Sequence, residues 1–303
     1  MKPSTILVAL LLLTARSARA EDIAPPDAPL PFPGIAQGAL PTMTPGHWAG
    51  ETARLFMSLR FDLGYLYLKP RVSFGYGKPF YAWAGIDIAP FITPDEGGGY
   101  SGLRLQLDWF EIRAGGRFVH AFTRDYLTPQ PSYTLVDLYE AAGRPVNYLD
   151  LEAEASAAIP VGPGNILALF TVESIQLAPA GTEVFDETLH VIVSPPPVYR
   201  ARLGYSLILG REHAGRLGLL AEDIEIPDRE ARVIRVGVTG SFDIDDHLQF
   251  VATVLIPVYG PDSLGLLGAD YTELGLRYRW ATGQSHIPQP LGPASELPGD
   301  HHP

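Results

Sequence analysis

The sequence predicts an all-β protein, an antiparallel transmembrane β-barrel of about 12 strands, with about 10 as the alternative count. Three observations lead to this prediction. Apolar and polar residues alternate through many segments of strand length. The 303 residues include 31 glycines and 29 prolines, which indicates frequent turns. Beyond the N-terminus, no apolar run approaches the ~20 residues that a membrane-spanning helix needs.

The first expected strand, residues 55–69, shows the alternation most clearly. Successive side chains of a strand point to opposite faces. One face is apolar and ends in two tyrosines: Leu55, Met57, Leu59, Phe61, Leu63, Tyr65 and Tyr67. The other face is small or charged: Ser58, Arg60, Asp62 and Gly64. A strand between lipid and an aqueous lumen requires this division.

Later segments repeat the pattern, and turn residues separate them. Further strands are expected at residues 71–75, 80–89, 102–108, 111–123, 148–159, 165–177, 199–209, 215–226, 231–242, 247–258 and 271–280. Residues 71–75 are short for a spanning strand, and residues 215–226 alternate least regularly. If residues 71–75 are irregular, about 10 strands become possible.

The expected connections differ in length. Long interruptions fall at residues 94–99, 124–147 (with a short helix expected within 135–142) and 178–197, and short turns fall near residues 109, 162, 212 and 244. If the first strand runs outward, the long connections all lie outside and the short turns face the periplasm. Bacterial outer-membrane barrels show this asymmetry.

Four regions follow from these patterns. Residues 1–20 match a secretory signal peptide, because a positive start and an apolar run precede Ala18-Arg19-Ala20. Residues 21–50 form a proline-rich leader, residues 51–281 the barrel, and residues 282–303 a disordered tail. The expected location is therefore the outer membrane, after export across the inner membrane.

Charge and cysteine content exclude several classes of function. The chain has 34 acidic and 22 basic residues, so a nucleic-acid partner is disfavoured. It contains no cysteine, which excludes disulfides, thiolate metal sites and a lipid-modified N-terminal cysteine.

The last expected strand contains Glu273-Leu-Gly275-Leu-Arg-Tyr278-Arg-Trp280. A polar residue, a glycine and two aromatics at this spacing resemble the terminal β-signal of bacterial outer-membrane β-barrel proteins. Leu274, Leu276, Tyr278 and Trp280 share one face, with both aromatics where an interfacial girdle belongs. The resemblance implies that Gly275, Tyr278 and Trp280 form an assembly signal. It also implies two partners, outer-membrane lipid and the outer-membrane assembly machinery.

The charged faces of the strands form the candidate site. They would line the lumen with Arg60, Asp62, Asp87, Arg104, Asp108, Glu111, Arg113, Arg117, Glu152, Glu154, Arg200, Arg202, Arg235, Glu273 and Arg277. Such charges can select solutes in a channel, or pair with one another and fill a structural barrel. Barrels near this size are found both open and filled.

The predicted function is a porin-like channel for small solutes, or a structural barrel, without catalysis or a cofactor. Asp243, Asp245, Asp246 and His247 place carboxylates beside a histidine, as omptin-type proteases do near the barrel mouth. Here they fall in a predicted short periplasmic turn, and aspartates are common in turns. His301 and His302 make a poor metal site, so no metal is predicted.

Two alternatives remain open. The first is an outer-membrane enzyme of the lipase or protease kind, which would need a nucleophile or an Asp/His set at the barrel mouth. The second is a soluble secreted β-sandwich, in which the apolar faces would meet in a core.

Overall fold

The computed structural model describes residues 48, 51–141, 143–209, 215–271 and 273–283. The expected signal peptide, the leader except Trp48, the expected turn near residue 212 and the tail from residue 284 lie outside the described residues. Within the described residues, no helix is long and apolar enough to cross a bilayer.

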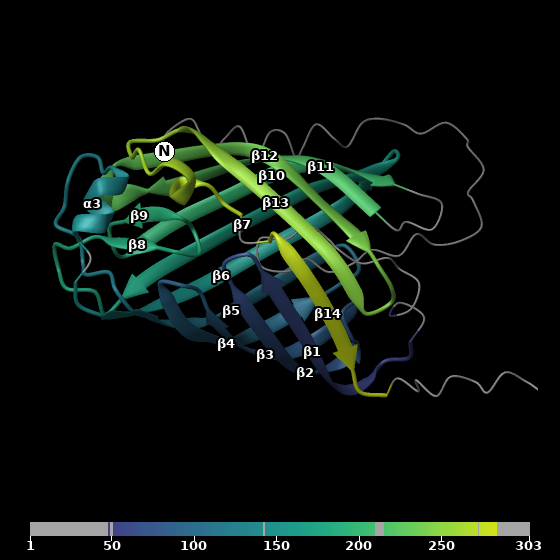
Figure 1. The fold of residues 1–303 in the computed structure, drawn as a ribbon. Helices are drawn as coiled ribbons and strands as arrows, with labels where there is room; N and C mark the ends of the chain where they lie inside the picture. Colours follow the sequence, from purple (N-terminus) through teal and green to yellow (C-terminus); the bar gives the residue numbers. More distant parts are fainter. Residues whose placement is uncertain (1–47, 49–50, 142, 210–214, 272, 284–303) are drawn as a thin grey trace, which may run out of the picture. The chain divides into compact units, whose positions relative to one another are not determined.

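Twelve antiparallel strands close into a barrel, which confirms the predicted fold class and the larger strand count (Figure 1). The strands are β1 (Arg54–Gly64), β2 (Leu68–Lys78), β3 (Ala82–Ile92), β4 (Glu96–Gln106), β5 (Phe110–Ala121), β6 (Val146–Val161), β7 (Gly164–Gln176), β10 (Pro197–Leu209), β11 (Gly215–Ile226), β12 (Ala231–Asp243), β13 (Leu248–Tyr259) and β14 (Gly275–Ala281). The barrel closes because β1 pairs with β14, from Ser58 opposite Ala281 to Gly64 opposite Gly275.

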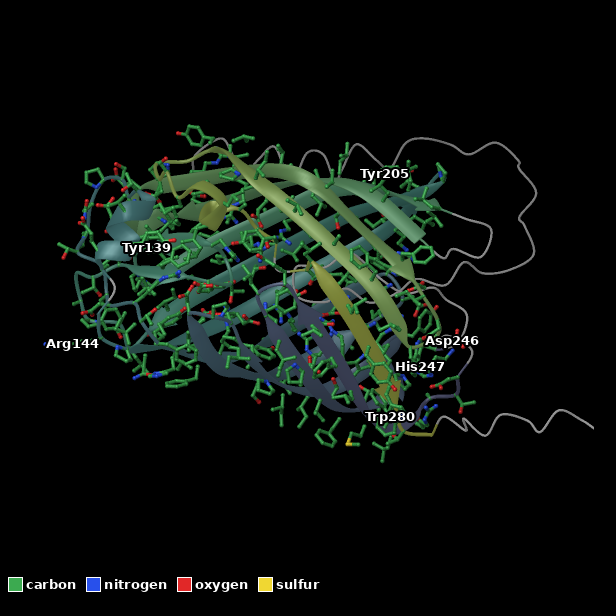
Figure 2. All side chains as sticks on the ribbon, in the orientation of Figure 1. Tyr139, Arg144, Tyr205, Asp246, His247 and Trp280 are labelled. Carbon is green, nitrogen blue, oxygen red and sulfur yellow. The ribbon has the colours of Figure 1, made fainter. Side chains whose placement is uncertain are left out.

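The three long connections all lie at one end of the barrel. The long ones carry helix α3 (Leu135–Glu140), the hairpin β8 (Val184–Asp186) and β9 (Val191–Val193), and the 3-10 turn η2 (Gly265–Gly268). A further 3-10 turn, η1 (Pro227–Arg229), joins β11 to β12. Tyr139 and Arg144 lie at the end opposite to Asp246, His247 and Trp280 (Figure 2). We call the end with α3 and the hairpin the loop end.

Three local expectations were wrong. The strand expected at residues 71–75 is present but was predicted too short, because β2 extends from Leu68 to Lys78 and pairs with both β1 and β3. The expected loop at 94–99 is shorter, since Gly97, Gly98 and Gly99 pair with β3 and β5. Tyr67 does not continue the outer face. β1 ends at Gly64, and the Tyr67 ring turns into the interior, where it lines a cavity.

The outer surface of the barrel is apolar. Leu55 is 81% exposed, Leu103 66% and Leu219 68%, and aromatic side chains such as Phe74 and Phe118 are also exposed. A water-soluble protein rarely exposes a continuous apolar surface of this kind, whereas lipid would cover it. Most arginines and carboxylates of the strands lie inside instead. This arrangement excludes the β-sandwich alternative, in which the apolar faces would form the core.

The hairpin β8–β9 folds into the barrel at the loop end, although residues 178–197 were expected to be a long loop outside the barrel. Val184, Leu189, Val191 and Val193 form an apolar cluster with residues of the inner wall. A second cluster joins Phe185 and Ile192 of the hairpin to residues of the other two long connections. Apolar burial therefore holds the three connections together as a cap.

Trp48 lies near the opposite end of the barrel. Its side chain is buried against Phe80, Tyr81 and Ala281, and its ring meets Phe80 edge-on with a centroid distance of 4.7 Å. One residue of the predicted leader is therefore packed against the turn between β2 and β3.

Candidate functional site: the charged interior of the barrel

Most of the charged residues expected in the lumen are inside the barrel. All of the predicted residues are buried except Arg60, which is half-buried, and Asp108, which is exposed. Asp108 was wrongly assigned to the lumen because β4 ends at Gln106. Asp108 therefore lies in the tight turn before β5.

The strand register places opposite charges directly across from one another. Glu154 on β6 lies opposite Arg113 on β5, and its two carboxylate oxygens accept from Nε and Nη2 of Arg113 at 3.0 and 3.1 Å. Asp62 on β1 likewise lies opposite Arg277 on β14, whose Nε donates to Asp62 Oδ1 at 2.7 Å. These ionic pairs cross-link neighbouring strands, including the pair that closes the barrel.

A second network surrounds Glu222 on β11. Its Oε1 accepts from Nε of Arg200 and Nε of Arg202, each at 2.6 Å, and its Oε2 accepts from Nη1 of Arg235 at 2.9 Å. Asp270, in the connection between β13 and β14, pairs with Arg200 at 3.0 Å and also with Arg202. The network thereby ties a loop-end connection to the inner wall.

Arg235 also anchors the inserted hairpin. Its guanidinium donates to the backbone oxygens of Leu189 and His190 at 2.7 and 2.8 Å. Arg117 reaches the same hairpin by donating to the hydroxyl of Thr188. Strand cations therefore satisfy polar groups of the hairpin that would otherwise be buried without partners.

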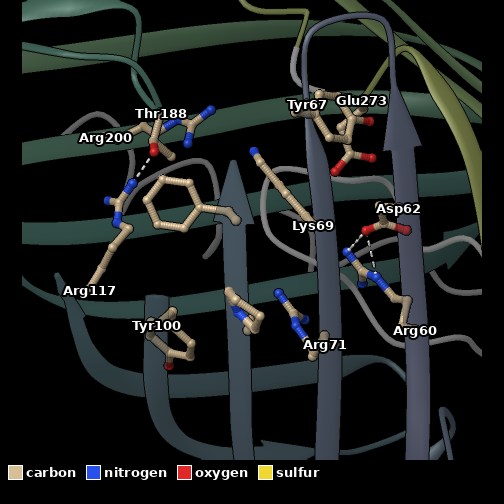
Figure 3. A pocket seen from close by; sticks show the side chains of 13 residues that line it. Arg60, Asp62, Tyr67, Lys69, Arg71, Tyr100, Arg117, Thr188, Arg200 and Glu273 are labelled. Carbon is tan, nitrogen blue, oxygen red and sulfur yellow. Dashed lines mark hydrogen bonds and ion pairs between the residues drawn. The ribbon is translucent and has the colours of Figure 1, made fainter. Parts of the chain in front are cut away.

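A small cavity of about 40 Å³ lies beside these groups, with room for a few water molecules (Figure 3). Five cations face it, and so do two carboxylates, Asp62 and Glu273. The cations are Arg60, Lys69, Arg71, Arg117 and Arg200. Asp62 is already paired with both Arg60 and Arg277. Arg117 and Arg200 are paired in the same way, with Asp150 and with Glu222. Cations nevertheless outnumber carboxylates among the side chains that line the cavity.

Several charged residues of the interior were not among the predicted lumen residues. Lys69 and Arg71 belong to β2, which was expected to be short, and Glu222 belongs to the least regular expected strand. Asp186 and Asp270 lie in connections, where alternation gives no signal. Asp150 does share the polar face of its strand with Glu152 and Glu154, so its placement could have been found from the sequence.

Two titratable groups lie in the hairpin between β8 and β9, outside the spanning strands. Burial raises the pKa of the Glu187 carboxyl from 4.5 to about 7, although Arg124 pairs with it. Burial, followed by the charge of Arg235, lowers the pKa of His190 from 6.5 to about 4. The hairpin thus favours the neutral form of both side chains.

The aspartate and histidine group near residue 245 lies in the turn between β12 and β13. Asp245 Oδ1 accepts from the backbone N–H groups of His247 and Leu248, each at 2.7 Å. Nδ1 of His247 lies 2.8 Å from the backbone oxygen of Arg279. These hydrogen bonds give Asp245 and His247 a structural role in the turn. The turn lies at the end of the barrel far from the cavity and the hairpin.

The closed sheet, the apolar outer surface and the ionic interior together decide the class of architecture. This chain is a β-barrel of the outer-membrane type. No protein-family model matches the sequence, and no curated protein matches it.

The solved structures that the chain matches include a porin, a BamA structure and an outer-membrane protein. The NanC porin matches with a TM-score of 0.34 and 9% identity, over 75% of this chain and 98% of that chain. A BamA structure from Haemophilus ducreyi matches with a TM-score of 0.34 and 9% identity, over 76% and 70% of the two chains. OmpT from Vibrio cholerae matches with a TM-score of 0.32 and 9% identity, over 76% and 99%.

Proposed function

We propose that this protein is an integral outer-membrane barrel that acts as a narrow, porin-like channel for small anions, without enzymatic activity. In this proposal the β8–β9 hairpin restricts flow through the barrel at the loop end. The observation that carries the proposal is the cavity inside the barrel, where five cations meet two carboxylates.

The charge of the cavity supports anion selectivity. Rings of basic side chains favour anions in narrow pores, because the ion exchanges part of its hydration for these groups. The Lys69 ammonium lies 4.8 Å from the centroid of the Tyr67 ring, and no carboxylate lies within ion-pair distance of it among the described residues. Lys69 is therefore the cation best placed to meet a passing solute.

The packing of the interior supports a low conductance. The cavity is small, and the hairpin and its apolar cluster occupy the lumen at the loop end. Ions would pass in larger numbers only when the hairpin moves away from the wall. We expect small current steps at rest and larger steps in a variant whose residues 184–193 are replaced by a glycine-serine linker.

The test is conductance of the refolded protein in planar bilayers under a KCl gradient. The reversal potential should show preference for chloride, and Lys69→Gln should reduce that preference. Lys78→Gln is the matched control, because Lys78 ends the same strand at the opposite end of the barrel and does not line the cavity. Cation preference in the unmodified protein would refute the anion channel.

A structural barrel is the second candidate, because the buried ion pairs cross-link most of the wall. It predicts no current steps from either the unmodified protein or the hairpin replacement. Both candidate functions include the same route to the membrane. In each, a signal peptide at residues 1–20 directs export, and the assembly machinery recognises Gly275, Tyr278 and Trp280. Recovery of the protein in outer-membrane fractions would support that shared location.

A further inference from the structure

Three acidic side chains from separate elements meet inside the loop end of the barrel. They are Asp150 on β6, Glu173 on β7 and Asp186 on the hairpin strand β8. Each offers a carboxylate oxygen, and these oxygens all lie within 4.8 Å of one another. None of the three side chains is more than 3% exposed. Buried carboxylates rarely gather in this way without a cation, because their mutual repulsion is strong in a medium of low polarity.

The positive charge near this cluster is insufficient. Arg117 Nη2 lies 2.5 Å from Asp150 and 3.4 Å from Glu173. Asp186 forms no ion pair among the described residues; its Oδ1 instead accepts from the backbone N–H groups of Thr188 and Leu189. Arg117 Nη2 also lies 3.4 Å from Glu152, so one guanidinium serves three carboxylates of the wall, and none of the described cations pairs with Asp186.

Oxygen atoms without partners are a second, independent indication of a ligand. Asp150 Oδ1, Asp186 Oδ2 and the Tyr148 hydroxyl are enclosed, and none has a hydrogen-bond partner among the described residues. Tyr148 is 1% exposed and shares the inner face of β6 with Asp150, two residues away. Asp186 is the charged group that acts most strongly on the Tyr148 hydroxyl. An enclosed hydroxyl without a partner destabilises a fold, whereas a metal ion would provide one.

We propose that Asp150, Glu173 and Asp186 bind a calcium ion, with the Tyr148 hydroxyl directed at the same site, and that the ion fastens the β8–β9 hairpin to the barrel wall. Calcium prefers oxygen ligands at 2.3–2.6 Å, so two ligands on opposite sides of one ion stand about 5 Å apart. Magnesium binds at 2.0–2.1 Å and limits that separation to about 4.2 Å. The three oxygens, all within 4.8 Å of one another, lie within the span of a single calcium ion.

Direct binding is measured on the refolded full-length protein in a neutral detergent, after treatment with a chelator and without lipopolysaccharide, whose phosphates bind calcium. Titration calorimetry with calcium chloride should show one saturable site, with weaker binding of magnesium. Terbium should bind the same site and luminesce on excitation of tyrosine, and calcium should displace it. Absence of saturable calcium binding in the unmodified protein would refute the site, whatever the variants do.

A pair of variants separates a specific site from a general effect of charge. Asp186→Asn removes a ligand charge and should weaken calcium binding by more than about tenfold, because ligand charge sets calcium affinity. Glu187→Gln changes the neighbouring residue of the same hairpin, which pairs with Arg124 outside the cluster. It should leave the affinity within about twofold. Equal losses in both variants would contradict a defined site.

The role of the ion at the hairpin has its own measurement. Calcium should slow amide hydrogen exchange at residues 184–193 in the unmodified protein and in Glu187→Gln, but not in Asp186→Asn. Retained heat-modifiable migration on gels shows that each variant is folded. If calcium binds but exchange at the hairpin does not change, the fastening role is wrong.

Discussion

Arg277 shows how a single buried residue supports the closure of the barrel. Its guanidinium lies between Asp62 on the first strand and Glu273, with N···O distances of 2.7 and 3.4 Å. All three side chains are buried, so water cannot compensate for the loss of one member. The three charges therefore matter to stability mainly because removal of one would leave the others buried without compensation.

We expect Arg277→Met to lower the free energy of unfolding by about 3–5 kcal/mol, because Asp62 and Glu273 would remain buried with less positive charge nearby. Denaturant unfolding in detergent or liposomes measures this value. Arg277→Met combined with Asp62→Asn should recover part of the loss, since one uncompensated charge is then removed. A loss below about 1 kcal/mol in the single variant, the range of an exposed ion pair, would contradict this reasoning.

Gly275 is a second residue on which closure depends. A Cβ atom added there would lie 2.2 Å from the backbone oxygen of Leu63 on the neighbouring strand. Gly275→Ala should therefore destabilise the barrel by about 1–3 kcal/mol through overpacking and reduce the folded band on unheated gels. Gly99→Ala is the control, because a Cβ at Gly99 would meet no atom within 4 Å. Similar folded fractions in the two variants would refute a steric role for Gly275.

Among the elements, the β8–β9 hairpin combines two groups whose ionisation affects docking in opposite directions. The pKa of Glu187 is about 7 when the hairpin is docked against the barrel wall and near 4.5 otherwise. The contribution of this carboxyl to the stability of docking is therefore complete below pH 4.5 and is lost as the pH rises through 7. The pKa of His190 is about 4 when the hairpin is docked and near 6.5 otherwise. The contribution of this imidazole to the stability of docking is therefore complete above pH 6.5 and is lost as the pH falls through 4.

The two effects should largely cancel in the unmodified protein between pH 4.5 and 6.5. Glu187→Gln leaves only the histidine, so docking of the hairpin should strengthen as the pH rises across this window. His190→Asn leaves only the carboxyl, so docking should weaken instead. Amide exchange at residues 184–193, corrected for the intrinsic effect of pH, measures both trends. Parallel pH profiles in the two variants would contradict the opposing effects.

The elements also show what could be predicted from the sequence and why the rest could not. Strands with strict alternation, such as β4 with Leu103, Arg104 and Leu105, were predicted because lipid and lumen impose opposite requirements on their two faces. The same rule predicted most of the buried charges. It could not place Asp186 or Asp270, because the position of a loop residue depends on where the connection folds back. It also failed at Tyr67, which follows the end of its strand.

At the scale of the whole molecule, the pairing of β1 with β14 distinguishes a barrel from an open sheet. Phe61 lies opposite Tyr278 in this pairing, and both side chains are exposed on the outer face. The Cα atoms of directly opposite antiparallel residues are about 4.5–5.5 Å apart, within the range that a disulfide can bridge. The natural chain contains no cysteine, so an introduced pair has no competing thiol.

We expect Phe61→Cys combined with Tyr278→Cys to form a disulfide under mild oxidation of the folded protein, because closure brings the two positions together. The linked chain should migrate faster than the reduced chain on a denaturing gel, since the bond holds residues 61 and 278 in one loop. Phe61→Cys combined with Phe250→Cys is the control: Phe250 is also exposed on the outer face but lies on β13, beyond β14. If the control pair forms the link as readily as the test pair, or the test pair forms none, β1 and β14 are not neighbours and the barrel does not close in this register.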